Sequence, residues 1–179
     1  MTGPKRAAGK TSATAPAAKK TSAFGAAAVN AGLTVQPGKS AVKNEYRKGV
    51  TSRRAHRFLA SVDLDADLKL IEPGAHRWDY GLGLIDAQGK ESAWWVEPHP
   101  ASSTHEVNRM LAKLEWLTAK LESPEFGKLH ALTDAARLKG IAFRWLALSG
   151  DICIRPGSSQ ARRLALRGLA APTRYVVLP

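Results

Sequence analysis

The chain has 179 residues, a length that suits one folded domain with room for an appendage, since domains run to about 100–200 residues. It contains 27 Lys and Arg against 15 Asp and Glu, a formal charge of +12. Such a surface attracts polyanions or acidic partners, with nucleic acid as the leading candidate. There is no run of about 18 apolar residues able to span a bilayer and no apolar signal-peptide core, so we expect a cytoplasmic protein without a membrane partner.

The positive charge is concentrated at the N-terminus. Residues 1–43 hold seven Lys and Arg and no acidic residue, whereas residues 44–179 hold 20 basic and 15 acidic side chains. The first 43 residues are mostly small or polar and bury too little apolar surface to offset the entropy cost of ordering. We therefore predict a disordered basic tail over 1–43 and a single α/β domain over 44–179. The tail either contacts polyanions or merely keeps the protein soluble.

The domain is expected to begin with a charged, weakly helical stretch over residues 44–56 and a strand over residues 58–64. Three aspartates then follow at two-residue spacing: Asp63, Asp65 and Asp67. A calcium-binding loop would need Gly where Leu68 stands. We interpret the aspartates as a turn or helix start with solvated carboxylates.

Residues 77–99 predict a β-hairpin. Apolar residues alternate on both sides of a turn that begins with Asp86 and ends with Gly89. This pattern favours a three-residue loop with its Gly in the left-handed conformation. In that register Asp86 lies opposite Lys90, and the numbers of paired residues sum to 176.

The register has consequences for side chains further along both strands. Trp95 lies opposite Gly81, where a large ring covers the missing side chain. Asp79 lies opposite Glu97, and His99 projects from the same face two residues further on. A slip of one residue would destroy this arrangement.

A long helix is predicted to begin after residue 100, with Ser103 and Glu106 spaced as a capping box. Its apolar face is formed by Val107, Met110, Leu111, Leu114, Leu117 and Leu121. Its opposite face is expected to carry Arg109, Lys113 and Lys120. The helix should end near Ser123 and Pro124.

The remaining elements alternate between helix and strand. We expect a helix over 126–138, a strand over 141–148 with a hairpin partner over 152–155, a helix over 158–169 and a strand over 174–178. This order favours a mixed sheet flanked by helices. The only cysteine, Cys153, is expected to be buried between Ile152 and Ile154.

Two opposed carboxylates repel each other unless a cation compensates them. Mg²⁺ or Mn²⁺ suits the oxygens of Asp79 and Glu97 and retains water for chemistry on a phosphodiester. His99 or Lys113 would then orient that water or hold the phosphate. The helix over 158–169 offers three further candidates for phosphate contacts, or simply a solvated face: Arg162, Arg163 and Arg167.

Asp79 on one strand, followed by Glu97-Pro98-His99 on the next, resembles the restriction-endonuclease-like superfamily, the PD-(D/E)xK nucleases. The resemblance covers roughly residues 58–178 in element order. It implies a restriction-endonuclease-like core in which Asp79 and Glu97 bind a divalent metal and a Lys after the Glu aids the attacking water. His99 stands at the position of that Lys, and Trp78 replaces the Pro usually associated with the Asp.

These departures leave several hypotheses open, because a neutral imidazole does not duplicate a permanent ammonium. Lys113 could supply that charge from the helix. The protein is accordingly a metal-dependent nuclease, a non-catalytic nucleic-acid-binding module, or a protein-interaction component of a defence, toxin or mobile-element system. In a purely structural interpretation, Asp79 ends a strand, Glu97 pairs with Arg77 or Lys113, and His99 serves a turn.

Overall fold

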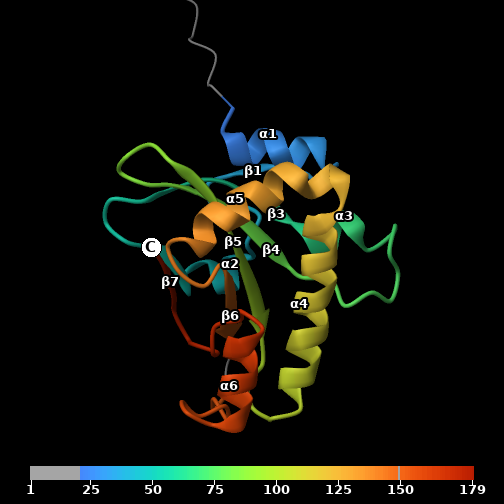
Figure 1. Ribbon diagram of the computed structural model, residues 1–179, viewed down its shortest axis with the longest axis vertical. Coiled ribbons are helices and arrows are strands. Elements are labelled where there is room, and N and C mark those ends of the chain that lie inside the picture. The colour runs from blue at the N-terminus through green and yellow to red at the C-terminus, as the bar shows by residue number, and fades with distance from the viewer. Residues whose placement is uncertain (1–20, 149) are drawn as a thin grey trace, which may run out of the picture.

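The structure is a computed structural model and describes residues 21–148 and 150–179. Its centre is a five-stranded mixed sheet with the order β1-β3-β4-β5-β6 (Figure 1). The pairs β1/β3, β3/β4 and β4/β5 are antiparallel, and β5/β6 is parallel. The strands are β1 (Gln36–Pro37), β3 (Arg57–Asp63), β4 (Tyr80–Ile85), β5 (Glu91–His99) and β6 (Phe143–Ala147). The predicted mixed sheet flanked by helices is confirmed.

Helices and a second small sheet cover the two faces of the large sheet (Figure 1). One face contacts α1 (Ala23–Asn30), α4 (Glu106–Glu122) and α5 (Gly127–Arg137), with the 3-10 turn η1 (Pro124–Phe126) between the last two. On the other face lies the segment between α2 (Asn44–Arg47) and β2 (Val50–Ser52), where Gly49 contacts Leu146 of β6. β2 pairs in parallel with β7 (Val176–Leu178). The short helices α3 (Leu64–Leu68) and α6 (Ser159–Leu166) follow β3 and β6.

The β4–β5 hairpin has the predicted register. Its pairs run from Tyr80 with Val96 to Ile85 with Glu91, so the paired numbers sum to 176 throughout. The Asp86 N–H donates to the Lys90 carbonyl at 3.0 Å, and the loop glycine before Lys90 has a φ of 79°. The short loop determines the pairing of every residue along both strands.

The side of β4 that faces the helices is crowded. A Cβ placed on Gly81 would lie 2.7 Å from the Trp95 ring, which confirms that this ring covers the glycine. A Cβ on Gly83 would lie 2.5 Å from Phe24 of α1. Glycine is therefore required at both positions, because aromatic rings occupy the space of any larger side chain.

The apolar face of α4 is as predicted, and all six of its apolar residues are buried. The proposed capping box is wrong, since the helix begins at Glu106 with His105 at its N-cap and no side-chain cap bond. Lys113 was expected on the opposite face, but its side chain turns toward the sheet and is only 16% exposed. Two carboxylates of the sheet attract it there.

The tail prediction for residues 1–43 is wrong for the part from residue 21 onward. Phe24, Ala27 and Ala28 of α1 are buried against the sheet. The Glu91 carboxylate accepts the first N–H groups of this helix, from Ala23 at 3.0 Å and Phe24 at 2.9 Å. Small alanines let α1 pack closely on the sheet around a single phenylalanine. The segment has few large apolar residues, so its composition did not indicate a buried helix. Residues 1–20 lie outside the described residues.

The hairpin expected after β6 is also wrong. Residues 152–155 form no strand, because the outer edge of β6 is bridged by Leu169 and Thr173 instead. Cys153 is exposed rather than buried, and its thiol donates to the Ser102 carbonyl at 3.0 Å. The three aspartates start a helix as interpreted, with Asp63 accepting the Ala66 N–H at 2.9 Å. Within residues 21–148 and 150–179, no helix is long and apolar enough to cross a membrane.

If α1 is part of the core, Phe24→Ala should lower the free energy of unfolding by about 3–5 kcal/mol, because it removes a fully buried ring. Urea unfolding followed by far-UV circular dichroism measures this. Val29→Ala on the same helix is the matched control, since Val29 is 60% exposed. Equal stability of the two variants would show that the helix contributes nothing to the core.

Candidate functional site

Three charged residues from three elements meet where β5 approaches its end. Asp79 immediately precedes β4, Glu97 lies near the end of β5, and Lys113 lies in the middle of α4. The Lys113 Nζ is 3.1 Å from Asp79 Oδ1 and also bonds Glu97 Oε1. Glu97 Oε2 accepts the Asp79 N–H at 2.8 Å. The two carboxylates therefore meet as the hairpin register predicts, and we call these three residues the Lys113 cluster.

The Lys113 cluster is largely shielded from water. The Glu97 side chain is 1% exposed, compared with 24% for Asp79 and 16% for Lys113. Burial, together with the Asp79 charge, raises the pKa of Glu97 to about 8. Burial opposes the charge of Lys113, but Glu97 and Asp79 outweigh it and raise the pKa of that lysine. The two shifts share one cause, because the buried carboxylates and the ammonium lie together away from water.

The oxygens of Asp79 and Glu97 are of the type that Mg²⁺ and Mn²⁺ prefer. In this structure, however, the Lys113 Nζ bonds both carboxylates, and a metal ion bridging the same two oxygens would compete with it. Within the part of the chain that the structure describes, no three His, Cys, Asp or Glu side chains come together as metal ligands. As arranged, the cluster does not fit a divalent ion.

His99 lies on the same face of β5 as Glu97, two residues further on, but it has a different partner. Its Nε2 is 2.7 Å from Glu106 Oε2, at the start of α4. Its backbone carbonyl accepts the Trp145 indole N–H at 2.9 Å. Glu106 also contacts Arg109, with 3.6 Å between Nη1 and Oε2. The structure thus brings Asp79, Glu97 and Lys113 together and pairs His99 with Glu106.

The predicted arginines lie on α6, near the end of the molecule where β5 ends and α4 begins (Figure 1). All three of these predicted arginines have exposed side chains: Arg162, Arg163 and Arg167. Arg163 Nη1 donates to Asn108 Oδ1 of α4 at 2.8 Å, which holds α6 against that helix. The Cys153 N–H donates to the Ala101 carbonyl at 2.9 Å just beyond β5. The arginines and the cluster therefore lie on neighbouring parts of the fold.

Two further exposed arginines, Arg155 and Arg174, lie in the same C-terminal segment of the chain. Sequence reasoning overlooked them because each is isolated between neutral residues. A different sequence feature reveals them: residues 152–179 contain five arginines and no acidic residue. We call these five residues the C-terminal arginine group.

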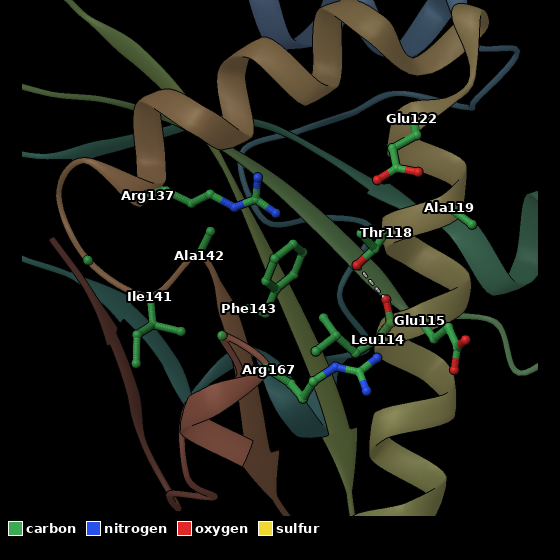
Figure 2. A pocket seen from close by; sticks show the side chains of 12 residues that line it. Leu114, Glu115, Thr118, Ala119, Glu122, Arg137, Ile141, Ala142, Phe143 and Arg167 are labelled. Carbon is green, nitrogen blue, oxygen red and sulfur yellow. Dashed lines mark hydrogen bonds between the residues drawn. The ribbon is translucent and has the colours of Figure 1, made fainter. Parts of the chain in front are cut away.

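A separate pocket of about 610 Å³ lies between α4, the α5–β6 connection and the end of α6. Figure 2 shows Arg137 and Arg167 entering it from different elements, with Phe143 between them and Glu122 on α4. The Arg137 guanidinium lies 5.3 Å from the centre of the Phe143 ring and also pairs with Asp134. Two glutamates line the pocket beside its two arginines, so its charges balance and give no preference for a polyanion.

The raised pKa of Glu97 predicts a specific pH dependence. The Glu97 carboxyl loses its proton near pH 4.5 in the unfolded state but only at about pH 8 in the folded state. Its titration therefore lowers the free energy of unfolding as pH rises from about 4.5 to about 8. Glu97→Gln removes that titration while keeping an acceptor oxygen. The stability of this variant relative to wild type should therefore increase from pH 5 to pH 8.5 in urea unfolding.

The exposed Glu122→Gln is the control and should follow the pH profile of the wild type. A stability difference between Glu97→Gln and wild type that stays constant across this pH range would contradict the assignment.

No protein-family model, curated protein or solved structure matches this chain.

Proposed function

We propose that this protein binds DNA or RNA without requiring a metal ion. The observation that carries the proposal is the C-terminal arginine group, five exposed arginines in a segment without any acidic residue. Charges of one sign repel each other, and a polyanion relieves that repulsion. Nucleic acid offers phosphates at the regular spacing that several guanidinium groups can contact together.

The Lys113 cluster supports a binding role over catalysis. A lysine ammonium already compensates the two carboxylates at the position where the nuclease hypothesis requires a metal ion. The restriction-endonuclease-like assignment is part of the proposal, in a non-cutting form. Its support is that Asp79, just before β4, meets Glu97 on the neighbouring strand β5 of a mixed sheet, with a helix and a parallel strand following.

The proposal also places the protein in the cytoplasm. Nucleic acid is accessible there, and a single exposed thiol such as that of Cys153 stays reduced. The formal charge of +12 favours fast, salt-dependent association with this class of partner.

Replacing Arg155 and Arg162 with Gln should weaken nucleic-acid binding and its dependence on salt. The slope of log K against log salt should fall by about 0.7–0.9 for each phosphate that the variant no longer neutralises. Arg163 is kept because it holds α6 to α4. Fluorescence anisotropy with labelled DNA and RNA, in buffer containing a chelator, measures the slope.

The count-matched control replaces the exposed Lys90 and Lys128, which lie in the hairpin loop and on α5. This control removes the same charge and should change the slope less. Absence of any binding at low salt by the wild-type chain would refute the proposed function.

Metal-dependent nuclease activity is the second candidate function. It is favoured because the carboxylates of Asp79 and Glu97 lie together beside the Lys113 ammonium. We expect wild-type protein with Mg²⁺ or Mn²⁺ to leave single-stranded and duplex substrates intact on a gel, because Lys113 competes with the ion for both carboxylates. Cleavage that disappears in both Asp79→Asn and Glu97→Gln would instead establish this second candidate.

A further inference from the structure

Tyr175 is an exposed aromatic residue in the C-terminal segment, next to β7. It is 71% exposed, although large aromatic side chains usually contribute to the core. It lines a pocket of about 520 Å³ and also a smaller one of about 240 Å³. The larger volume falls within the range of about 300–1,000 Å³ that is usual for ligand pockets. An accessible ring beside two hollows has the geometry of a stacking platform.

Positive side chains line both hollows around this ring. Lys48 and Arg174 line the larger pocket, where Glu45 is the one acidic lining residue. Arg144 lines the smaller pocket, and its guanidinium lies 5.8 Å from the centre of the Trp94 ring. Within the described residues, the buried Arg144 Nε has no hydrogen-bond partner. Positive side chains near an exposed aromatic ring suit a ligand that alternates phosphates with flat rings.

The larger pocket lies at the same end of the sheet as the Lys113 cluster, on the face opposite the helices. Tyr46 of α2 and Gly49 line it, and Gly49 contacts Leu146 of β6. The pocket also includes residues 146–148, at the end of β6 beside the last residues of β5. Arg174 of the C-terminal arginine group lines this pocket as well.

We infer that this surface binds single-stranded nucleic acid, with a base stacked on Tyr175 and the flanking phosphates held by Lys48 and Arg174. The inference rests on the proposed function and specifies its ligand. In a duplex the faces of the bases are covered by their neighbours, so an aromatic ring in a hollow reaches only unstacked bases. Stacking is tolerant of sequence, because every base has a π-face.

The test compares a labelled oligothymidine with a duplex of the same length, by anisotropy at fixed salt. Tyr175→Ala should weaken single-strand binding by about 5- to 150-fold, the effect of losing one stacked base. Tyr175→Phe keeps the ring and should retain the affinity. Leu70→Ala, at an exposed apolar position that lines neither hollow, is the matched control and should also retain it.

Urea unfolding of each variant verifies folding, which the exposure of Tyr175 should leave intact. Unchanged single-strand affinity in Tyr175→Ala, or a wild-type preference for the duplex, would overturn the inference and leave the proposed function standing. Failure of the wild type to bind either nucleic acid would overturn both.

Discussion

The contact of one ammonium with two carboxylates joins the main elements of this fold. Lys113 comes from the long helix α4, Glu97 from strand β5, and Asp79 from the residue before β4. A carboxylate as deeply buried as Glu97 is costly unless it is compensated, and the Lys113 ammonium compensates it. The cluster therefore requires that helix and hairpin keep one relative position. The meeting of the Asp79 and Glu97 carboxylates at Lys113 acts here as a structural centre.

The parallel pairing of β5 and β6 decides where the C-terminal segment of the chain packs. A parallel pair needs a crossover, and α4 and α5 provide it across one face of the sheet. β6 therefore ends beside the end of β5, and the chain that follows must pack near the start of α4. The C-terminal arginine group and Tyr175 both belong to that final segment. Arg174 and Tyr175 consequently lie beside residues 146–148, at the end of β6.

Local sequence patterns predicted several elements correctly because their physical causes are local. The three-residue loop after Asp86 determines the hairpin register, and the spacing of apolar residues determines the buried face of α4. Two predictions failed because distant contacts decided them. The alanine-rich α1 is ordered by packing against Gly83 and by the Glu91 carboxylate, and residues 152–155 lack a strand partner because Leu169 and Thr173 bridge the edge of β6.

The sequence by itself determined that Asp79 and Glu97 meet, because alternation along paired strands places them on one face in one register. It also determined the excess of positive charge and the arginines exposed on α6. Only the tertiary structure decided what compensates the carboxylates and what His99 contacts. Lys113 and Glu106 approach β5 through the packing of α4 on the sheet, and the direction of a long side chain depends on that packing. The surface around Tyr175 likewise joins segments from opposite ends of the domain, which no local pattern could reveal.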